Sequence, residues 1–364
     1  MTTTSLRKWK VGWGYTAKCN MSCPFCYSRK VRQKDDEIPL EKAKRFVDDN
    51  AAEIDSINYG TGECVLSHNW GKLAAYVRNN YPTIRQSLTT NGSLAHQIAT
   101  NKCDAEQIVR MIDEIDVSLD FCEHSKHNQS RRNENAFNWS LDTLEFCKKN
   151  ELISTIVMVG YAETLTPQNL DGIFSLASNY HSFVRINVLR PVKGTQLPPP
   201  SNTEMHIALQ YILCRYKTVS LCDPLFGSLY DPSECKPQHV INSCRILPDG
   251  MITPSTYLIE PQWFTENICN STQLRRISDA DAFQKIESAI IPKACNTCNY
   301  QDNCRGGATD RRILHYDSLT ERDPYCPFRD SNMIYEQIPL QRSGRINSYP
   351  TVHDGYLPTL IFDY

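Results

Sequence analysis

The chain has 364 residues, enough for a sizeable core, with 40% hydrophobic residues, 22% charged residues and a formal net charge of −2. This balance is typical of a globular protein and argues against a basic nucleic-acid-binding surface. No apolar run approaches the roughly 18 residues of a membrane span. The N-terminal stretch also lacks the apolar segment of a signal peptide, so we predict a cytoplasmic protein with no membrane or nucleic-acid partner.

Strand-like and helix-like segments alternate along the first part of the chain. The predicted strands are 9–16, 56–60, 84–92, 114–121, 152–160 and 182–191. The predicted helices are 39–54, 69–81, 105–112, 138–150, 166–180 and 201–217, the fifth beginning with a Thr cap and Pro. Six strand–helix units in series indicate parallel strands joined by right-handed crossovers.

Six units are too few for a closed eight-unit barrel. A partial (β/α)6 barrel fits this α/β pattern better than a flat doubly wound sheet, although periodicity alone does not separate the two. In either architecture the site lies at the C-terminal ends of the strands. We therefore predict a barrel domain over residues 1–220.

The regular alternation ends after about residue 220. Residues 221–330 are rich in Cys, Pro, Asp and Gly, which indicates a small metal-organised α+β domain. Residues 331–364 form a tail with aromatic residues and few helix signals. This tail either packs on the barrel or covers the site, and the sequence does not decide between them.

Sixteen cysteines are many for a chain without a signal peptide, and in a reducing compartment clustered cysteines commonly bind metal. Cys19, Cys23 and Cys26 follow the first predicted strand, at the expected end of the barrel. A cubane [4Fe–4S] cluster normally takes four thiolates, so three leave one iron open for another ligand. The alternative is a non-catalytic protein in which zinc binds these cysteines and a second cysteine group at residues 295–326. Iron–sulfur protein is brown and zinc protein is colourless, so colour distinguishes the two.

The spacing Cys-x3-Cys-x-aromatic-Cys, here with Phe25 before Cys26, resembles the signature of the radical S-adenosylmethionine (SAM) superfamily. In that family the SAM amine and carboxylate chelate the open iron. One electron, from a flavodoxin- or ferredoxin-type donor, cleaves SAM to a 5′-deoxyadenosyl radical that abstracts a hydrogen atom from the substrate. The resemblance implies that Phe25 shields the cluster and that Tyr27 follows it in the site.

Further motifs at the strand ends agree with this resemblance. "YGTGEC" resembles the family's Gly-Gly-Glu motif, which implies that Glu63 holds the SAM amino group and that Gly62 allows close backbone approach. "TTNG" follows the third strand as in relatives. Besides Gly62 and Glu63, the resemblance assigns five further residues to SAM binding. They are Thr61, Thr90, Asn91, Ser118 and one arginine, either Arg131 or Arg132.

A second cysteine group has the spacing Cys-x2-Cys-x5-Cys-x21-Cys and resembles the C-terminal half of a SPASM domain, an auxiliary-cluster module of radical SAM enzymes. This implies one auxiliary [4Fe–4S] cluster on Cys295, Cys298, Cys304 and Cys326. Ser255 and Ala308 replace cysteines that belong to the first auxiliary cluster of a full SPASM domain, so we expect that cluster to be absent. Cys235 and Cys244 remain possible ligands.

The resemblance implies the chemistry class but leaves the substrate open. No extension of the usual leader-peptide-binding kind precedes the first strand, and Thr256 replaces the acid of sulfatase-maturing relatives. We favour a peptide substrate, modified by crosslinking, oxidation or epimerisation as in ribosomal natural products. The alternative is a dehydrogenase, epimerase or decarboxylase of a sugar, aminocyclitol or nucleoside.

Hydrogen abstraction needs no general base, but a later proton transfer does. The residues predicted to act near the cavity are Cys64, Asp120, Arg190, Tyr257 and Asp310, with His124 and Arg185 as further candidates. Arg190, after the sixth strand, would suit a substrate carboxylate or phosphate if it faces the cavity. An auxiliary cluster with four thiolates has no open iron, which makes it an electron acceptor or relay.

Overall fold

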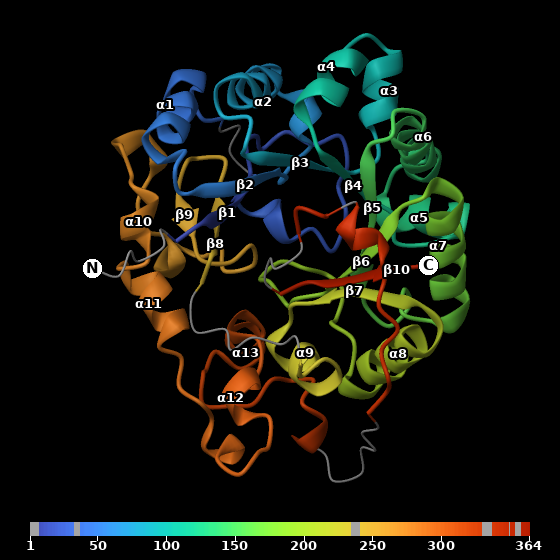
Figure 1. Cartoon of the computed structure of the whole chain (residues 1–364), viewed down its shortest axis with the longest axis vertical. Coiled ribbons are helices and arrows are strands. Elements are labelled where there is room, and N and C mark those ends of the chain that lie inside the picture. The colour runs from blue at the N-terminus through green and yellow to red at the C-terminus, as the bar shows by residue number, and fades with distance from the viewer. Residues whose placement is uncertain (1–6, 33–36, 234–240, 330–336, 349, 354–357) are drawn as a thin grey trace.

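The parallel barrel strands form the centre of one ten-stranded sheet in the computed structural model, which describes residues 7–32, 37–233, 241–329, 337–348, 350–353 and 358–364. The order across the sheet is β7-β10-β6-β5-β4-β3-β2-β1-β8-β9. Neighbours from β1 to β6 pair in parallel and in chain order, which confirms the predicted (β/α)6 arrangement. Figure 1 shows the curved sheet with helices α1 to α8 around its outer face.

The strands are short and mostly buried, as expected for a parallel sheet covered by helices. Their bounds are β1 Trp9–Trp13, β2 Ile54–Tyr59, β3 Arg85–Thr90, β4 Glu114–Ser118, β5 Ile153–Gly160, β6 Phe183–Val188, β7 Lys217–Leu221, β8 Ser243–Ile246, β9 Ile252–Thr253 and β10 Leu360–Asp363. All six predicted strands are present, with ends that differ from the prediction by a few residues.

The longest helices belong to the barrel. Their bounds are α1 Leu40–Asn50, α2 His68–Asn80, α3 Leu94–Ala99, α4 Ala105–Met111, α5 His124–Arg131, α6 Ala136–Lys149, α7 Pro167–Tyr180, α8 Asn202–Arg215, α9 Pro224–Tyr230, α10 Leu274–Ile277, α11 Asp281–Glu287, α12 Gln301–Cys304 and α13 Thr309–Tyr316. The predicted start of α7 is confirmed, because the Thr166 side chain accepts a hydrogen bond from the Asn169 backbone and Pro167 follows.

Two helices of the barrel, α3 and α5, were not predicted. Helix α3 has six residues and α5 has eight. In the sequence, each lies in a stretch that resembles a polar connection between a strand and the next long helix. The four short helices after α9 agree with the prediction that only brief regular pieces follow residue 220. In Figure 1 these helices, in orange, lie beside β8, β9 and α9.

Both edges of the barrel are extended by strands from distant parts of the chain. On one edge β8 pairs in parallel with β1, and β9 returns antiparallel to β8. On the other edge β10 lies between β6 and β7 and is antiparallel to both. The end of the predicted tail therefore packs into the barrel sheet as a strand.

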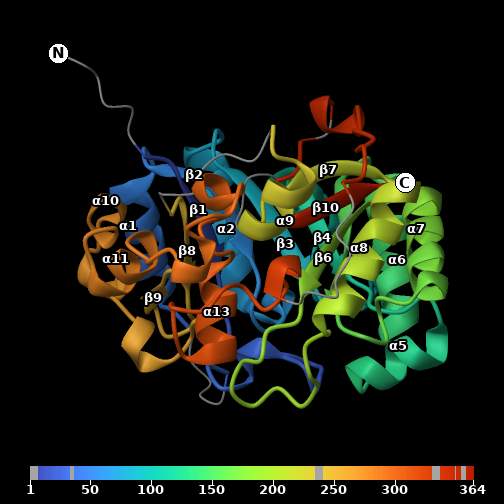
Figure 2. The same ribbon diagram turned by 90° about the horizontal axis from the view of Figure 1, so that it is seen from below.

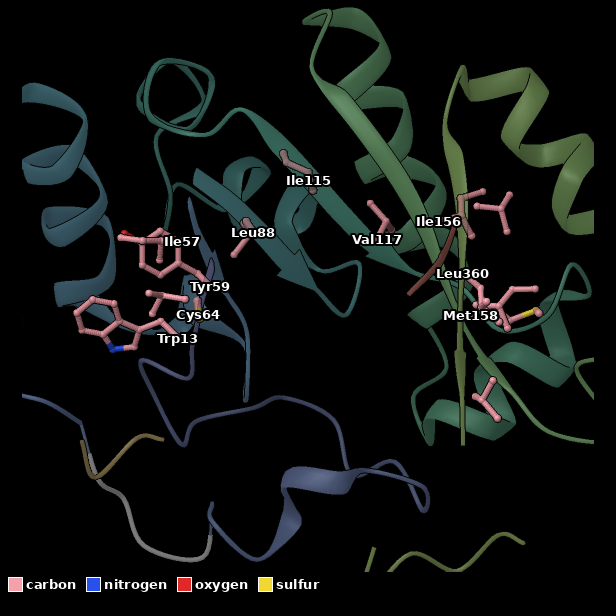
Figure 3. Close-up of a cluster of buried hydrophobic side chains, with 14 of the residues drawn as sticks. Trp13, Ile57, Tyr59, Cys64, Leu88, Ile115, Val117, Ile156, Met158 and Leu360 are labelled. Atoms are coloured by element: carbon pink, nitrogen blue, oxygen red, sulfur yellow. The ribbon is translucent and has the colours of Figure 1, made fainter. Parts of the chain in front are cut away.

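The main core lies between the sheet and its helices. Figure 3 shows part of it, where Trp13, Tyr59 and Leu88 from neighbouring strands meet apolar side chains of β4 and β5. Among the described residues, no helix is long and apolar enough to cross a bilayer.

Candidate radical SAM site

The loop after β1 carries three cysteines at the carboxyl end of the parallel strands. In Figure 2 this blue loop lies beside the yellow-green loop that follows β6. The two loops touch, because the Gln196 backbone donates to the Pro24 carbonyl oxygen at 3.1 Å. Cys19, Cys23 and Cys26 are all free thiols and line one cavity, here called the cysteine-loop cavity.

Most of the predicted site residues line this same cavity. They come from the cysteine loop, the ends of β2 to β4, helix α5, the loop after β6 and the segment after β9. These residues are Phe25, Tyr27, Thr61, Gly62, Thr90, Asn91, Ser118, Arg131, Arg190 and Tyr257. The parallel topology explains their convergence, because the carboxyl ends of neighbouring parallel strands meet at one edge of the sheet.

Polar and cationic groups surround the three thiols. The Asn91 amide nitrogen lies 3.7 Å from the Cys19 sulfur, and Arg32 Nη2 lies 3.4 Å from the Cys26 sulfur. Burial raises the pKa of Cys19 to about 11 and also raises that of Cys23, whose nearest cation is Arg131. Buried thiols beside guanidinium groups suit thiolates that are held by a metal centre.

Arg131 and Arg132, the two alternatives for the SAM arginine, have different environments. Arg131 is 7% exposed, lies over the Phe25 ring with 5.0 Å between guanidinium carbon and ring centre, and lines the cavity. Arg132 is exposed and donates to Gln196. Only Arg131 is therefore placed to meet a ligand in the cavity.

The Gly-Gly-Glu-like motif forms a sharp turn under the cysteine loop. Gly62 has a φ of +67°, and a Cβ atom there would lie 2.5 Å from the Thr16 carbonyl oxygen and closer still to that of Lys18. Thr61, at the position of the family's first glycine, has a φ of +78°, which is unusual for a β-branched residue. Such strain is characteristic of ligand-binding turns.

We expect Gly62→Ala to weaken SAM binding at least tenfold and to destabilise the fold by about 1–3 kcal/mol, because the new methyl group must displace the backbone just before Cys19. Equilibrium dialysis with SAM and urea unfolding measure the two effects. Gly71→Ala is the matched control, since nothing lies within 4 Å of a Cβ built there in helix α2. Equal SAM affinity in both variants would contradict the prediction.

Glu63 lies behind the cavity wall and is fully buried. Its Oε2 accepts the Asn91 backbone N–H at 2.7 Å, while Oε1 has no hydrogen-bond partner. Burial raises its pKa to about 7, and the Asn91 N–H and the Thr90 hydroxyl oppose that rise. A carboxylate with one unpaired buried oxygen suits a cationic ligand such as an amino group.

The raised pKa makes the stability of the SAM-free protein depend on pH. Between about pH 4.5 and 7 the folded state retains a proton that the unfolded state has lost, so stability falls as pH rises through this window. At about pH 8 we expect Glu63→Gln to be more stable than wild type by about 3 kcal/mol, a gap that closes toward pH 4.5. Urea unfolding across this range checks it, and a pH-independent difference would contradict it.

Three other predicted residues lie away from the cavity or are already paired. Cys64 is buried among Trp13 and Tyr59 in the core, as Figure 3 shows. Asp120 pairs with Arg131 at 2.7 Å, and His124 is exposed on α5. Cys64 is therefore sterically isolated, while Asp120 orients Arg131 and is not free to act as a base.

Asp310 and Arg190 meet at the far wall of the site. Arg190 Nε lies 3.5 Å from Asp310 Oδ2, and its guanidinium carbon lies 4.9 Å from the centre of the Tyr257 ring. Arg190 Nη1 also donates to the Val188 carbonyl oxygen at 2.6 Å. These contacts already occupy much of the guanidinium that was predicted to bind a substrate anion.

The second cysteine group also encloses one cavity. Cys295, Cys298, Cys304 and Cys326 line it together with apolar side chains of α9, and all four are free thiols. Cys244 lies elsewhere, buried on β8 in the main core, and Cys235 lies outside the described residues. The geometry thus groups the four predicted auxiliary ligands without Cys244.

The spacing of the thiols can be compared with that of a zinc site. Four thiolates on one tetrahedral zinc lie about 3.8 Å apart, given a Zn–S bond of about 2.3 Å. In the described part of the chain, the only His, Cys, Asp or Glu ligand atoms that lie in threes within 4.8 Å of one another are those of Glu114, Asp116 and His353. In neither cysteine group, therefore, do three described thiols lie that close together.

The positions that lack first-cluster cysteines line a separate cavity. Ser255 and Ala308 face it together with Asp310 and Thr309, and the Ser255 hydroxyl lies 3.3 Å from Asp310 Oδ2. Space thus exists where two ligands of a full SPASM domain are replaced.

The family model described as the radical SAM superfamily matches residues 13–167, which include the cysteine loop and the strand-end motifs. Residues 13–167 are a radical SAM domain. Mycofactocin maturase MftC of Mycobacterium tuberculosis is 22% identical to this chain. The alignment covers 86% of this chain and 81% of MftC.

Solved radical SAM structures share the fold. Streptococcus suis SuiB bound to S-adenosylmethionine superposes with a TM-score of 0.68 at 15% identity, covering 88% of this chain and 77% of SuiB. The structure of anSMEcpe with bound AdoMet and the Cp18Cys peptide gives 0.69 at 17% identity, covering 88% of this chain and 94% of anSMEcpe. The α/β fold with a cysteine-rich C-terminal region is thereby confirmed.

Membership in the radical SAM superfamily implies a [4Fe–4S] cluster and SAM, and the residues of the cysteine-loop cavity fit both. Three free thiols offer three ligands, and the unpaired Glu63 oxygen suits an ammonium group. Two relevant residues escaped the sequence interpretation, namely Arg32 beside Cys26 and Arg245 beside Thr61. Arg245 could have been noticed as a charged residue inside the apolar stretch that follows Cys244.

Proposed function

We propose that this radical SAM enzyme abstracts a hydrogen atom from a peptide substrate. The carrying observation is that three free thiols and the predicted SAM residues line one cavity, which also includes Arg190 and Tyr257 from other parts of the chain. When bound at Cys19, Cys23 and Cys26, a [4Fe–4S] cluster supplies the electron that cleaves SAM to the hydrogen-abstracting radical.

The chain's own residues would bind SAM and exclude water. Glu63, whose buried Oε1 is unpaired behind the cavity wall, would pair with the SAM amino group. Arg131, which lines the cavity, would pair with the SAM carboxylate. Ser118, Thr90 and Asn91 offer hydroxyl and amide groups on the same wall. Phe25 covers the cysteine loop with an apolar ring.

An auxiliary [4Fe–4S] cluster on the four cysteines from Cys295 to Cys326 is part of the proposal. Arg322 lies among these thiols and donates to Cys326, which partly offsets the rise in that thiol's pKa caused by burial. Four thiolates would ligate all four irons of this cluster and leave none open for a substrate. The cluster would instead accept an electron from the substrate radical in a net oxidation or crosslink. A flavodoxin- or ferredoxin-type protein would supply the electron for SAM cleavage.

A peptide is favoured by the relatives. MftC is named a maturase, and the fold shared with SuiB holds the precursor peptide SuiA in one of its structures. Both names support a peptide substrate for this chain. A small-molecule substrate is the competing outcome of the experiment.

The proposal is tested by co-expressing the enzyme with each short peptide that is encoded beside its gene. We expect one peptide to change mass, with 5′-deoxyadenosine formed in step. Deuterium at the altered carbon should appear in the 5′-deoxyadenosine. If every peptide is recovered unchanged while a sugar or nucleoside fraction stimulates 5′-deoxyadenosine formation, the peptide assignment is wrong.

A further inference from the structure

A second cavity, here called the inner cavity, adjoins the cysteine-loop cavity inside the barrel. The two share the side chains of Tyr27, Thr61 and Asn187. Two buried arginines, Arg185 and Arg245, line the inner cavity, and none of the described residues that line it is Asp or Glu. Its wall is therefore cationic.

Arg245 carries a buried charge that no carboxylate of the described residues neutralises. Its side chain is 3% exposed, and Nη2 donates to the Tyr27 hydroxyl at 3.2 Å and to Thr61 Oγ1. Its Nε has no acceptor, and none of its ion-pair or hydrogen-bond partners in the described residues is a carboxylate. A buried cation in this state is unfavourable unless a ligand supplies the opposite charge.

Arg185 contributes a second free donor on the same cavity. Its Nη2 pairs with Asp116 Oδ2 at 2.9 Å, whereas Nη1 has no acceptor although the residue is only 4% exposed. His353 lies near both arginines and is neutral, because burial and then Arg185 lower its pKa to about 3. Asp116 thus pairs with Arg185, whereas Arg245 has no carboxylate partner among the described residues.

We propose that the inner cavity binds a carboxylate of the substrate through Arg245 and the free Nη1 of Arg185. This inference rests on the proposed peptide substrate and assigns the chemical group that anchors it beside SAM. A carboxylate would neutralise the charge of Arg245 and accept a hydrogen bond from Arg185. The planar guanidinium fork also matches the two oxygens of a carboxylate.

Arg190, the residue first expected to bind such a group, is already engaged by Asp310, Val188 and Tyr257. Arg245 differs because the protein gives its charge no carboxylate partner among the described residues. The Arg245 contact with Thr61 also joins the carboxylate site to the SAM-binding turn. The substrate anchor and the SAM turn are thus connected through one side chain.

The experiment titrates small probes into the reconstituted, SAM-loaded enzyme by calorimetry. N-acetylglycine represents a C-terminal carboxylate, N-acetylaspartic acid α-amide a side-chain carboxylate, and N-acetylglycinamide the uncharged control. We expect one or both carboxylates to bind, with a Kd of about 1 mM. The amide should bind at least tenfold more weakly, and the stronger carboxylate indicates which end of a peptide is held.

Arg245→Gln should weaken carboxylate binding at least tenfold, while Arg245→Lys should restore part of it. The melting temperature of the ligand-free protein should stay level or rise, because a buried unpaired charge is removed. Arg132→Gln, at an exposed arginine, is the matched control.

Several outcomes would overturn the carboxylate site. These are equal binding of N-acetylglycine and its amide, equal binding by wild type and Arg245→Gln, or tighter binding of inorganic phosphate. A lowered melting temperature together with unchanged probe binding would make Arg245 a structural residue. Probe binding requires no radical chemistry, so its result is independent of whether a peptide is modified.

Discussion

Replacing Cys19, Cys23 and Cys26 together by alanine is expected to lower the iron of the anaerobically reconstituted protein from about eight to about four atoms per chain. Because each cubane holds four irons, the remaining four belong to the second cysteine group. The variant should also lose all SAM cleavage with dithionite, since no iron is left for SAM to chelate. Iron and sulfide analysis and the yield of 5′-deoxyadenosine measure these effects.

The chain offers matched controls for this result. Replacing Cys103, Cys122 and Cys214, three free thiols outside both cysteine cavities, should leave the iron content unchanged. Replacing Cys295, Cys298, Cys304 and Cys326 should also leave about four irons but retain SAM cleavage. A fall from about four irons to none in the first variant would mean that the second group holds no cluster, and redox-neutral chemistry would then be favoured.

Arg311→Met is expected to destabilise the protein by about 3–5 kcal/mol, because it leaves two buried carboxylates without their cation. Arg311 is fully buried and pairs with Asp223 at the start of α9 and with Asp323 before Cys326. Asp323 in turn accepts the Ala308 backbone N–H at 2.9 Å. Loss of Arg311 should therefore also lower iron retention at the second cysteine group. Urea unfolding and iron analysis test both effects.

Arg45→Met is the matched control, since Arg45 meets Asp49 on the exposed face of α1 at 4.0 Å and should change stability by less than about 1 kcal/mol. Neutralising Asp223 and Asp323 to asparagine in the Arg311→Met background should recover part of the loss, because the unpaired charges are then gone. If Arg311→Met unfolds at the wild-type urea concentration, the three charges do not stabilise the fold.

The barrel was predictable because its signals are local. Apolar strands alternate with helices, and motifs such as the Thr166 cap are read within a few residues. The strands that complete the sheet were not predictable in this way. Strand β8 pairs with β1, and β10 pairs with β6 and β7, through contacts that no periodicity in either segment encodes.

The site, like the fold, was only partly predictable from the sequence. The cysteine spacing and the strand-end position predicted a shared cavity, and the structure places those residues around it. Arg190 was expected to be free, but its partner Asp310 lies far along the chain, and sequence alone does not reveal such a pairing. Arg245 was missed for the same reason, because the lack of a carboxylate partner is a property of the folded environment.

The insertion of β10 between β6 and β7 has a consequence for biosynthesis. During translation, β6 leaves the ribosome long before residues 360–363. Until β10 emerges, the edges of β6 and β7 that pair with it stay unpaired while the rest of the barrel forms. Unpaired edges of this kind invite pairing with other chains. We therefore expect nascent barrels to depend on chaperones until β10 emerges. Slow translation of the last third of the chain would prolong that exposure and increase aggregation.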